Sequence, residues 1–361
     1  MAAGIHDFLK YVVDQKASDL HLKAGGPPYV RINGNLRKTD FPAMTAADCE
    51  RAAMELMNDE QAQKFKAKGE TDFAYSESGL GRFRVNVFHQ RGSVGMAARR
   101  VLPGAPAFET LGLPPAVKRL AEEHRGMILV TGPTSSGKTT TTGAMLNYVN
   151  AIWSCHILTI EDPIEILHPD RAAIVNQREI GHDTENFASA LRAAMRQDPD
   201  VIFVGEIRDP ETVKAALQAA ETGHLVISTL HTTDVSETVN RIIDFFPPHQ
   251  QKQIRVSLAG SLKGIISQRL LPRKDGKGRI PAVEVLIMNG RIRDLILNPE
   301  QTHMIHDIVA ESDFYGMQTF DQALLALYRA GLVELEDAMA AATNQHDFTI
   351  ALRQEGLQPV S

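Results

Sequence analysis

The sequence of 361 residues lacks several features that mark particular classes of protein. It has two cysteines, Cys49 and Cys155, and no Cys-x-x-Cys pair, which excludes a zinc ribbon and a disulfide framework and is typical of a reducing, cytosolic setting. No apolar run approaches the length of a membrane span, and the N-terminus lacks the layout of a signal peptide. The net charge is −6 without a block of basic residues, so a nucleic-acid partner is not expected.

One short stretch has the pattern of a phosphate-binding loop. Residues 132–139, GPTSSGKT, fit G-x-x-x-x-G-K-[ST], in which glycines turn backbone N–H groups onto a polyanion, lysine adds a positive charge and the last hydroxyl holds magnesium. A predicted buried strand at 126–130 precedes the loop and a predicted helix at 139–149 follows it, so a helix N-terminus points at the anion. The sequence therefore predicts binding of a nucleotide and Mg²⁺ by Gly132, Pro133, Thr134, Ser135, Ser136, Gly137, Lys138, Thr139 and Thr140.

The part of the chain before this loop mixes helical and strand patterns. Residues 1–101 predict a smaller α+β domain, and residues 102–116, which contain several prolines and glycines, predict a linker. Apolar spacing predicts helices at 4–16 and 45–69. Alternation predicts strands, with Asn33-Gly34 as a hairpin turn, at 18–22, 28–34 and 83–92.

From residue 117 to residue 289, predicted strands alternate with predicted helices. The strands GMILV, HILTI, DVIFVG and HLVIST, separated by helical stretches, indicate an α/β fold with a largely parallel sheet covered on both faces. A second helix follows an N-cap at Asp209 and ends at Gly223, and residues 290–361 predict a helical segment. In the helical stretch 186–197 we expect one buried apolar stripe, made of Phe187, Ala190, Leu191, Ala194 and Met195.

Acids and histidines lie next to the predicted strands, and ligands of an open α/β sheet bind at the carboxyl ends of strands. Glu161 and Glu165 follow one strand, Glu206 the next and His231 the last, whereas His224 precedes that last strand. ATP hydrolysis needs one carboxylate near magnesium and another that polarises the attacking water. We expect Glu206 to act on magnesium through water, and Glu161 and Glu165 are equal candidates for the general base. Each histidine could sense the γ-phosphate or serve as hydrogen-bonded scaffold.

Four of these segments together resemble the secretion ATPases that drive type II secretion and type IV pili. The phosphate loop, TIEDPIE at 159–165, DPDVIFVGEIRD at 198–209 and ETGHLVISTLHTTD at 221–234 are similar to the Walker A, Asp box, Walker B and His box of that family. ASDLHL at 17–22 and GRFRVNVFHQRG at 81–92 are similar to its N-terminal domain. Without a long N-terminal extension or paired Cys-x-x-Cys ligands, the chain resembles the twitching-motility branch, PilT, whose members retract pili.

The resemblance implies a PAS-like N-terminal domain joined to a RecA-like P-loop ATPase core, assembled as a homo-hexamer that binds ATP and Mg²⁺ between subunits. It implies that Arg82 and Arg84 reach the γ-phosphate, with Arg99 and Arg100 as further candidates, although the residues alone would equally suit a solvated strand face. It favours Glu165 as the general base. The implied partners are an inner-membrane pilus platform protein and a paralogous motor ATPase, with the chain peripheral to the cytoplasmic face of that membrane.

Two positions depart from the retraction branch. GRIRDLILNPE at 290–300 stands where the branch has A-I-R-N-L-I-R-E, and it keeps the amphipathic character but lacks the closing Arg-Glu pair. That element is tied to retraction rather than to ATP turnover. Ser135 stands where the family usually has glycine, and we expect a modest effect unless the position requires a positive φ.

These features predict a slow motor ATPase in which loss of the γ-phosphate reopens a joint near 102–115, so that hydrolysis drives domain rotation. A pilus-assembly or type II secretion ATPase of the same family is the alternative. The acidic balance disfavours a RecA-type nucleic-acid motor, and the absence of N-K-x-D disfavours a GTPase. The presence of Lys138, Thr139, Glu165 and Glu206 disfavours a scaffold that holds ATP without hydrolysing it.

Overall fold

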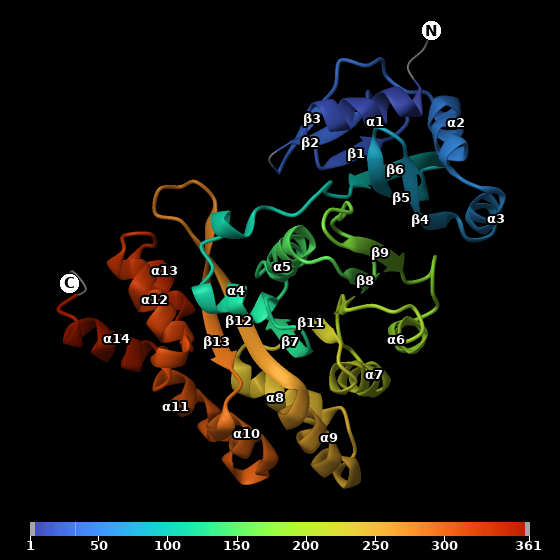
Figure 1. Ribbon diagram of the computed structural model, residues 1–361. Helices are drawn as coiled ribbons and strands as arrows, with labels where there is room; N and C mark the ends of the chain where they lie inside the picture. Colours follow the sequence, from blue (N-terminus) through green and yellow to red (C-terminus); the bar gives the residue numbers. More distant parts are fainter. Residues whose placement is uncertain (1–3, 33, 358–361) are drawn as a thin grey trace. The chain divides into compact units, whose positions relative to one another are not determined.

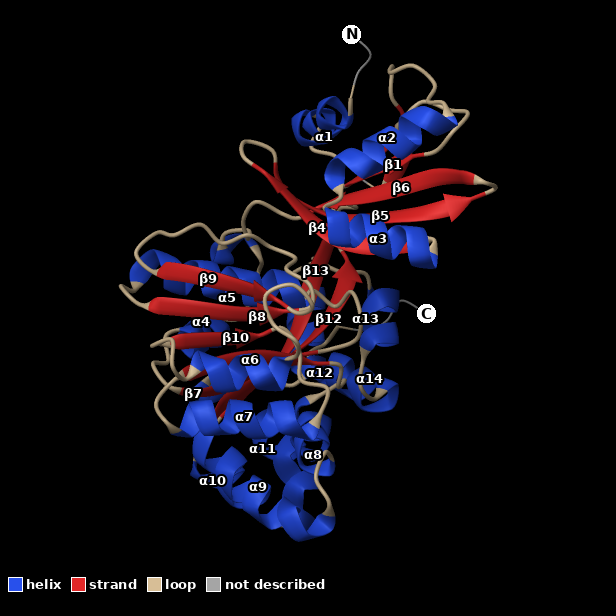
Figure 2. Ribbon diagram, turned by 90° about the vertical axis from the view of Figure 1, so that its right-hand side faces the viewer, coloured by secondary structure: helices blue, strands red, loops and turns tan. Residues whose placement is uncertain are grey.

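The computed structural model describes residues 4–32 and 34–357 of the chain (Figure 1). The chain divides into two compact units, Met1–Pro103 and Gly104–Ser361. The first unit contains an antiparallel sheet with three helices, and the second contains a larger, mostly parallel sheet (Figure 2). Among the described residues, no helix has the length and apolarity that a membrane span requires.

In the first unit, six strands pair antiparallel in the order β3-β2-β1-β6-β5-β4. Alternation along β5 buries Phe83, Val85 and Val87 against apolar side chains of the helices, and leaves Arg82 and Arg84 on the other face of the sheet. The elements of this unit are α1 (Ile5–Asp14), β1 (Asp19–Leu22), β2 (Tyr29–Ile32), β3 (Asn35–Lys38), α2 (Ala46–Leu56), α3 (Asp59–Lys68), β4 (Glu70–Glu77), β5 (Gly81–Gln90) and β6 (Ser93–Arg100).

Two details of this unit differ from the sequence prediction. The stretch 45–69 forms two helices instead of one, because the Asn58 side chain accepts a hydrogen bond from the Gln61 N–H and starts a new helix. That helix ends at Gly69, as predicted, where φ is 78°. Strands β4 and β6 were not predicted. β2 and β3 pair antiparallel across the predicted hairpin, but Asn33 itself lies outside the described residues.

In the second unit, seven strands form one sheet in the order β13-β12-β7-β11-β10-β8-β9. The pairs from β12 to β9 are parallel, and β13 is antiparallel to β12. The predicted α/β class with a largely parallel sheet is therefore confirmed. Its strands are β7 (Gly126–Thr131), β8 (His156–Glu161), β9 (Ile174–Glu179), β10 (Val201–Val204), β11 (Leu225–Leu230), β12 (Leu262–Pro272) and β13 (Arg279–Ile287).

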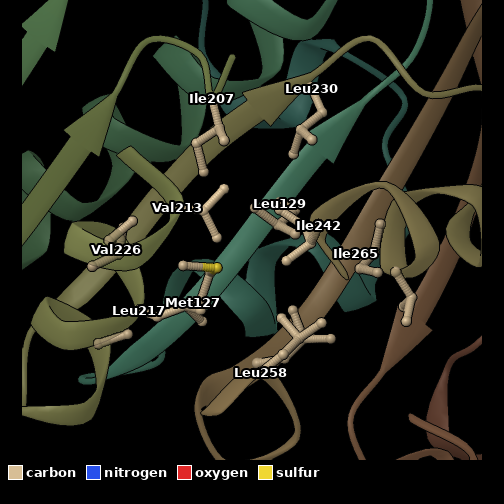
Figure 3. Packing of buried hydrophobic residues seen from close by; sticks show 14 of the residues in the cluster. Met127, Leu129, Ile207, Val213, Leu217, Val226, Leu230, Ile242, Leu258 and Ile265 are labelled. Atoms are coloured by element: carbon tan, nitrogen blue, oxygen red, sulfur yellow. The ribbon is translucent and has the colours of Figure 1, made fainter. Parts of the chain in front are cut away.

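Helices cover both faces of this sheet because its central strands are apolar on both sides. Along β7, Met127 and Leu129 join a core with α7 and α8 (Figure 3). Ile128 and Val130 join a second core with α4 and α5. The helices are α4 (Pro115–Ala121), α5 (Lys138–Ile152), α6 (Phe187–Ala194), α7 (Pro210–Glu221), α8 (Val235–Asp244), α9 (Pro248–Ser261), α10 (Gly290–Leu297), α11 (Ile305–Ala310), α12 (Phe320–Arg329), α13 (Leu335–Ala341) and α14 (Gln345–Gln354).

The predicted apolar stripe of α6 is correct for four of its five residues. Phe187, Ala190, Leu191 and Ala194 are buried, but Met195 is 38% exposed, because the helix ends at Ala194 and Met195 is its C-cap. The sequence analysis also missed three strands of this sheet, β9, β12 and β13. Of the missed strands, β12 ends at Pro272 and β13 at Ile287, so neither ends in an acid or a histidine.

The helix that follows the phosphate loop, α5, spans 15 residues and ends at Ile152, with Trp153 as its C-cap. The Trp153 indole stacks on the His124 ring, with 4.4 Å between the ring centroids and an angle of 17° between the planes. His124 lies just before β7, which leads into the phosphate loop. The stacked pair therefore joins the far end of α5 to the start of the strand that carries the loop.

Candidate active site

The phosphate loop connects the end of β7 to the start of α5 with three residues at positive φ. These are Gly132 at 141°, Ser135 at 66° and Gly137 at 95°. A Cβ on Gly132 would lie 2.5 Å from the Gln268 carbonyl oxygen, so only glycine fits there. Ser135 adopts the left-handed conformation that favours glycine. The position therefore requires a positive φ, and we expect serine in place of glycine to have more than a modest effect on the loop.

The Lys138 side chain folds back over its own loop. Its Nζ donates hydrogen bonds to the carbonyl oxygens of Gly132, at 2.6 Å, and Pro133, at 3.0 Å. Burial lowers the pKa of the Lys138 ammonium, and the negative charges of Glu206 and Glu165 oppose that shift. The ammonium is thus held in the loop, within electrostatic range of both carboxylates.

His231 joins Lys138 to Glu206 at the carboxyl edge of the sheet. Its Nδ1 lies 3.5 Å from Lys138 Nζ, and its Nε2 lies 3.4 Å from Glu206 Oε2. Glu206 also forms an ion pair with Arg208, a contact that the sequence analysis did not predict. A cavity of about 460 Å³ opens beside this cluster and is lined in part by Glu206, Arg208 and His231. The phosphate loop and the residues that follow β10 and β11 therefore meet at one place.

Two candidate general bases occupy different environments. Glu161 is buried at the end of β8, where its Oε1 accepts hydrogen bonds from Thr159 Oγ1 at 2.6 Å and Gln177 Nε2 at 3.1 Å. Burial raises the pKa of the Glu161 carboxyl to about 7, although these hydrogen bonds favour its charged form. Glu165 is exposed, and its charge acts on Lys138. The geometry suits Glu161 to supporting the segment that follows β8, and it suits Glu165 to facing a ligand.

His224 lies at the opposite edge of the sheet from the phosphate loop. It precedes β11, which runs parallel to β7, and Gly126 at the start of β7 pairs with Leu225. Its Nδ1 lies 2.9 Å from the Ala219 carbonyl oxygen at the end of α7. Within its own chain, the structure does not bring His224 to Lys138.

Arg82, Arg84 and Arg99 lie on the face of the first unit's sheet away from the core. Arg84 on β5 pairs directly with Arg99 on β6, so two positive charges stand opposite each other. Arg99 Nε donates to Asp19 Oδ1 at 2.7 Å, and Arg82 Nη1 lies 3.3 Å from Ser76 Oγ. Like charges at opposed positions of an antiparallel pair are destabilising unless an anion offsets them. Arg100 pairs with Phe83 and is half-buried.

Strand β12 brings Gln268 to the phosphate loop, which the sequence analysis missed. Gln268 is 1% exposed and its Nε2 donates to Thr141 Oγ1 at 2.9 Å, so it ties the first turn of α5 to the sheet. A cavity of about 270 Å³ beside this turn is lined by residues that include Gly137, Leu270 and Arg279. The apolar run GIISQRLL, residues 264–271, was the signal that could have revealed this strand.

A magnesium ion would find few protein ligands at this site. The Thr139 hydroxyl is exposed on the first turn of α5, and the Glu206 carboxylate lies at the end of β10. Among the described residues, no group of three or more His, Cys, Asp or Glu side chains could hold a metal ion. This arrangement fits Mg²⁺, which keeps several waters and takes the rest of its ligands from phosphate oxygens and one or two side chains.

Comparisons with known proteins agree with the predicted resemblance. Residues 2–339 match the sequence profile of the family described as type II/IV secretion system protein. The chain is 43% identical over 344 residues to the type IV pilus retraction ATPase PilT of Pseudomonas aeruginosa, covering 95% of this chain and 99% of PilT. It is 40% identical to the type IV pilus ATPase PilU of the same organism, covering 96% of this chain and 90% of PilU.

A solved structure of the pilus retraction motor PilT with bound ADP is 48% identical and superposes with a TM-score of 0.88, covering 96% of this chain and 98% of that one. The RecA-like core with a smaller N-terminal domain and a helical C-terminal segment, predicted from the sequence, is therefore confirmed, as is the likeness to the retraction branch. The chain belongs to the family of type II/IV secretion system proteins, and it is an ATPase of that family.

Proposed function

We propose that this chain is a hexameric motor that hydrolyses ATP to retract a type IV pilus. The observation that supports it best is the convergence of Lys138, His231 and Glu206 at one edge of the sheet, beside the phosphate loop. The similarity to PilT over nearly the whole of both chains favours retraction. The similarity to PilU is almost as extensive, so the role of the chain beside a paralogous motor needs a cellular test.

In the proposed reaction, the loop amides of residues 132–140 cradle the phosphates and Lys138 leaves its two carbonyl partners to bind the β- and γ-phosphates. Thr139 and, through water, Glu206 would hold Mg²⁺, which would supply positive charge against the negative charge that develops on the phosphates. Glu165 accepts a proton from the attacking water, and Glu161 supports its loop. His231, between Lys138 and Glu206, senses the γ-phosphate. We assign His224 a structural role at the other edge.

We further propose that Arg82 and Arg84 complete the site of a neighbouring subunit. The exposed position of Arg84 on β5 supports this, because its guanidinium has no acid directly opposite it in the strand pair and suits a phosphate of a neighbouring copy. Loss of the γ-phosphate then releases the contact between subunits, and the domains 1–101 and 117–289 rotate about the linker 102–116. The motor would act at the cytoplasmic face of the inner membrane on a pilus platform protein, without nucleic acid.

Phosphate release from ATP by the purified chain tests the reaction. We expect Glu206→Gln and Glu165→Gln each to reduce kcat by at least about 100-fold, a typical loss for a group that acts in the transition state. Glu211→Gln, which changes an exposed carboxylate in the first turn of α7, is the matched control and should retain full activity. Hydrolysis at the wild-type rate in both site variants would refute the assigned roles.

A gene deletion tests the direction of the work. If the chain retracts pili, cells without it carry more surface pili and do not twitch. Bald cells would instead indicate pilus extension. Cells with normal pili that twitch normally would contradict a role as the principal motor.

A further inference from the structure

Strand β9, at the edge of the large sheet, lies next to the segment that carries both candidate general bases. It runs parallel to β8, and its register places Glu179 opposite Glu161, where β8 ends. After β8 the chain passes through residues 162–173, and β9 begins at Ile174. Gln177 and Glu179 are two positions apart on this strand, so both project from the same face.

Gln177 makes three hydrogen bonds to this segment. Its Nε2 donates to Glu161 Oε1 at 3.1 Å and to the Ile166 carbonyl oxygen at 2.8 Å. Its Oε1 accepts the backbone N–H of His168 at 2.8 Å. The Gln177 side chain therefore holds the segment on both sides of Glu165. Its partner Glu161 lies four residues before Glu165, and its partners Ile166 and His168 lie after it.

Two further contacts restrain the same segment. Glu179 Oε2 accepts the Ile164 N–H, the residue before Glu165, at 3.2 Å. On the other side, the Ile166 side chain lies against α5 so closely that a Cβ on Gly143 would be 2.6 Å from its Cδ1 atom. The segment 161–168 is thus fixed between β9 and the helix that begins at Lys138, and the exposed Glu165 side chain is left to face a ligand.

We propose that Gln177 is a positioning residue for hydrolysis, which acts by fixing the backbone around Glu165. This inference rests on the proposed function, in which Glu165 is the general base. A glutamine suits the position because it offers two donors and one acceptor at the end of a long side chain. A glutamate would have no donor for the Ile166 carbonyl, and a leucine would have neither donor nor acceptor. A small displacement of a catalytic group lowers the rate strongly without loss of substrate binding.

Gln177→Leu and Gln177→Ala test the proposal, with Asn176→Ala as the matched control. Asn176 is the residue before Gln177 in β9, projects from the opposite face and makes its own side-chain hydrogen bond, from Nδ2 to His156 Nε2 at 2.8 Å. The measurements are kcat for phosphate release, KM for ATP, the Kd of a fluorescent ADP and the midpoint of thermal unfolding. Each is made on the full chain.

We expect both Gln177 variants to lower kcat by about 10- to 100-fold, with KM and Kd within about twofold of wild type. Asn176→Ala should leave kcat within about twofold. The loss should therefore appear in kcat and not in KM or Kd, because Glu165 acts on the attacking water and not on nucleotide binding. A support for the strand alone would change the unfolding midpoint and leave kcat within about twofold of wild type.

The outcome also separates this inference from the proposed function. If Glu165→Gln is inactive and both Gln177 variants turn over ATP at the wild-type rate, the positioning role is wrong and the reaction assignment stands. If Glu165→Gln is fully active, the reaction assignment is wrong and the inference falls with it. If both Gln177 variants fail to fold or to bind ADP, the side chain supports the fold as a whole, which also overturns the proposal.

Discussion

Lys138 Nζ lies 2.6 Å from the carbonyl oxygen of Gly132, six residues earlier in the same loop. With the second contact to Pro133, the lysine side chain folds back onto the loop and holds its ammonium at the loop carbonyls. Because a nucleotide phosphate is a stronger partner than a neutral carbonyl, binding should replace these bonds instead of adding to them. Lysine is therefore needed both for the shape of the free loop and for the bound ligand.

Replacing this lysine should abolish nucleotide binding. We expect Lys138→Ala to weaken the affinity for a fluorescent ADP by at least about 100-fold, since it removes a charge-assisted contact and a loop-closing group together. The control is Lys118→Ala, which removes a half-buried lysine of α4 that pairs with Glu109 outside the loop. An affinity within a few-fold of wild type in Lys138→Ala would contradict the assignment of the loop.

Ser135 should limit the stability of the phosphate loop. Its φ of 66° costs a non-glycine residue about 1–2 kcal/mol, more than the 0.5–1 kcal/mol that glycine costs through chain entropy. We therefore expect Ser135→Gly to raise the midpoint of thermal unfolding slightly. Thr134→Gly, next to it and without a positive φ, should lower the midpoint, and equal losses in the two variants would show that Ser135 is unstrained.

Glu284 should make stability depend on pH. Its carboxyl is buried in β13, where Oε2 accepts the Val235 N–H at 2.9 Å, and the charged groups around it are Asp234, Arg269, Asp321 and His306. Burial is the main cause that raises its pKa from 4.5 to about 8. The folded chain thus binds this proton more tightly than the unfolded chain, so the stabilisation is present at acidic pH and is lost as pH rises from 4.5 toward 8.

The measurement for Glu284 is the unfolding midpoint across that range. Glu284→Gln is neutral at every pH, so its midpoint relative to wild type should rise between pH 5 and pH 9, by roughly 2–4 °C for each kcal/mol of lost wild-type stability. The exposed Glu300→Gln is the control and should keep a constant difference. A difference that falls as pH rises would reverse the sign of this argument.

The neighbour-supplied arginines can be tested by mixing two inactive proteins. We expect a chain with both Arg82→Ala and Arg84→Ala to bind ADP but not to hydrolyse ATP. Mixed in equal amounts with Lys138→Ala and allowed to exchange subunits, it should recover about a quarter of wild-type activity, because that share of sites in a ring pairs an intact lysine with intact arginines. A mixture that stays inactive although mass measurement shows mixed rings would argue against sharing.

The candidate site residues of this chain were easier to recognise in the sequence than the elements that hold them. The phosphate loop and the strand ends at Glu161, Glu206 and His231 carry local patterns, and the structure places Lys138, Glu206 and His231 together as separate parts of one cluster. Strand β9, IVNQRE, was not predicted because four of its six residues are polar and it pairs on one side only. Its role depends on contacts with residues 161–168, which no local pattern encodes.

Other failures have similar physical causes. The stretch 45–69 breaks at Asn58 because the Asn58 side chain caps a new helix there, in competition with one continuous helix. Met195 is exposed because α6 ends one residue before it. The positive φ of Ser135 was not predicted, because nothing in the local sequence fixes a φ angle. The sequence analysis said only that serine would matter if the position required one. The arginines of β5 were found through the resemblance, and the face they share with Arg99 became visible only with the strand register.

The stack of Trp153 on His124 gives the molecule a built-in optical reporter. Trp153 is the single tryptophan of the chain, so all indole emission comes from the far end of the helix that begins at Lys138. A shift of that helix during a nucleotide cycle would change the overlap of the two rings and hence the fluorescence intensity, which can be followed in stopped flow without any added dye.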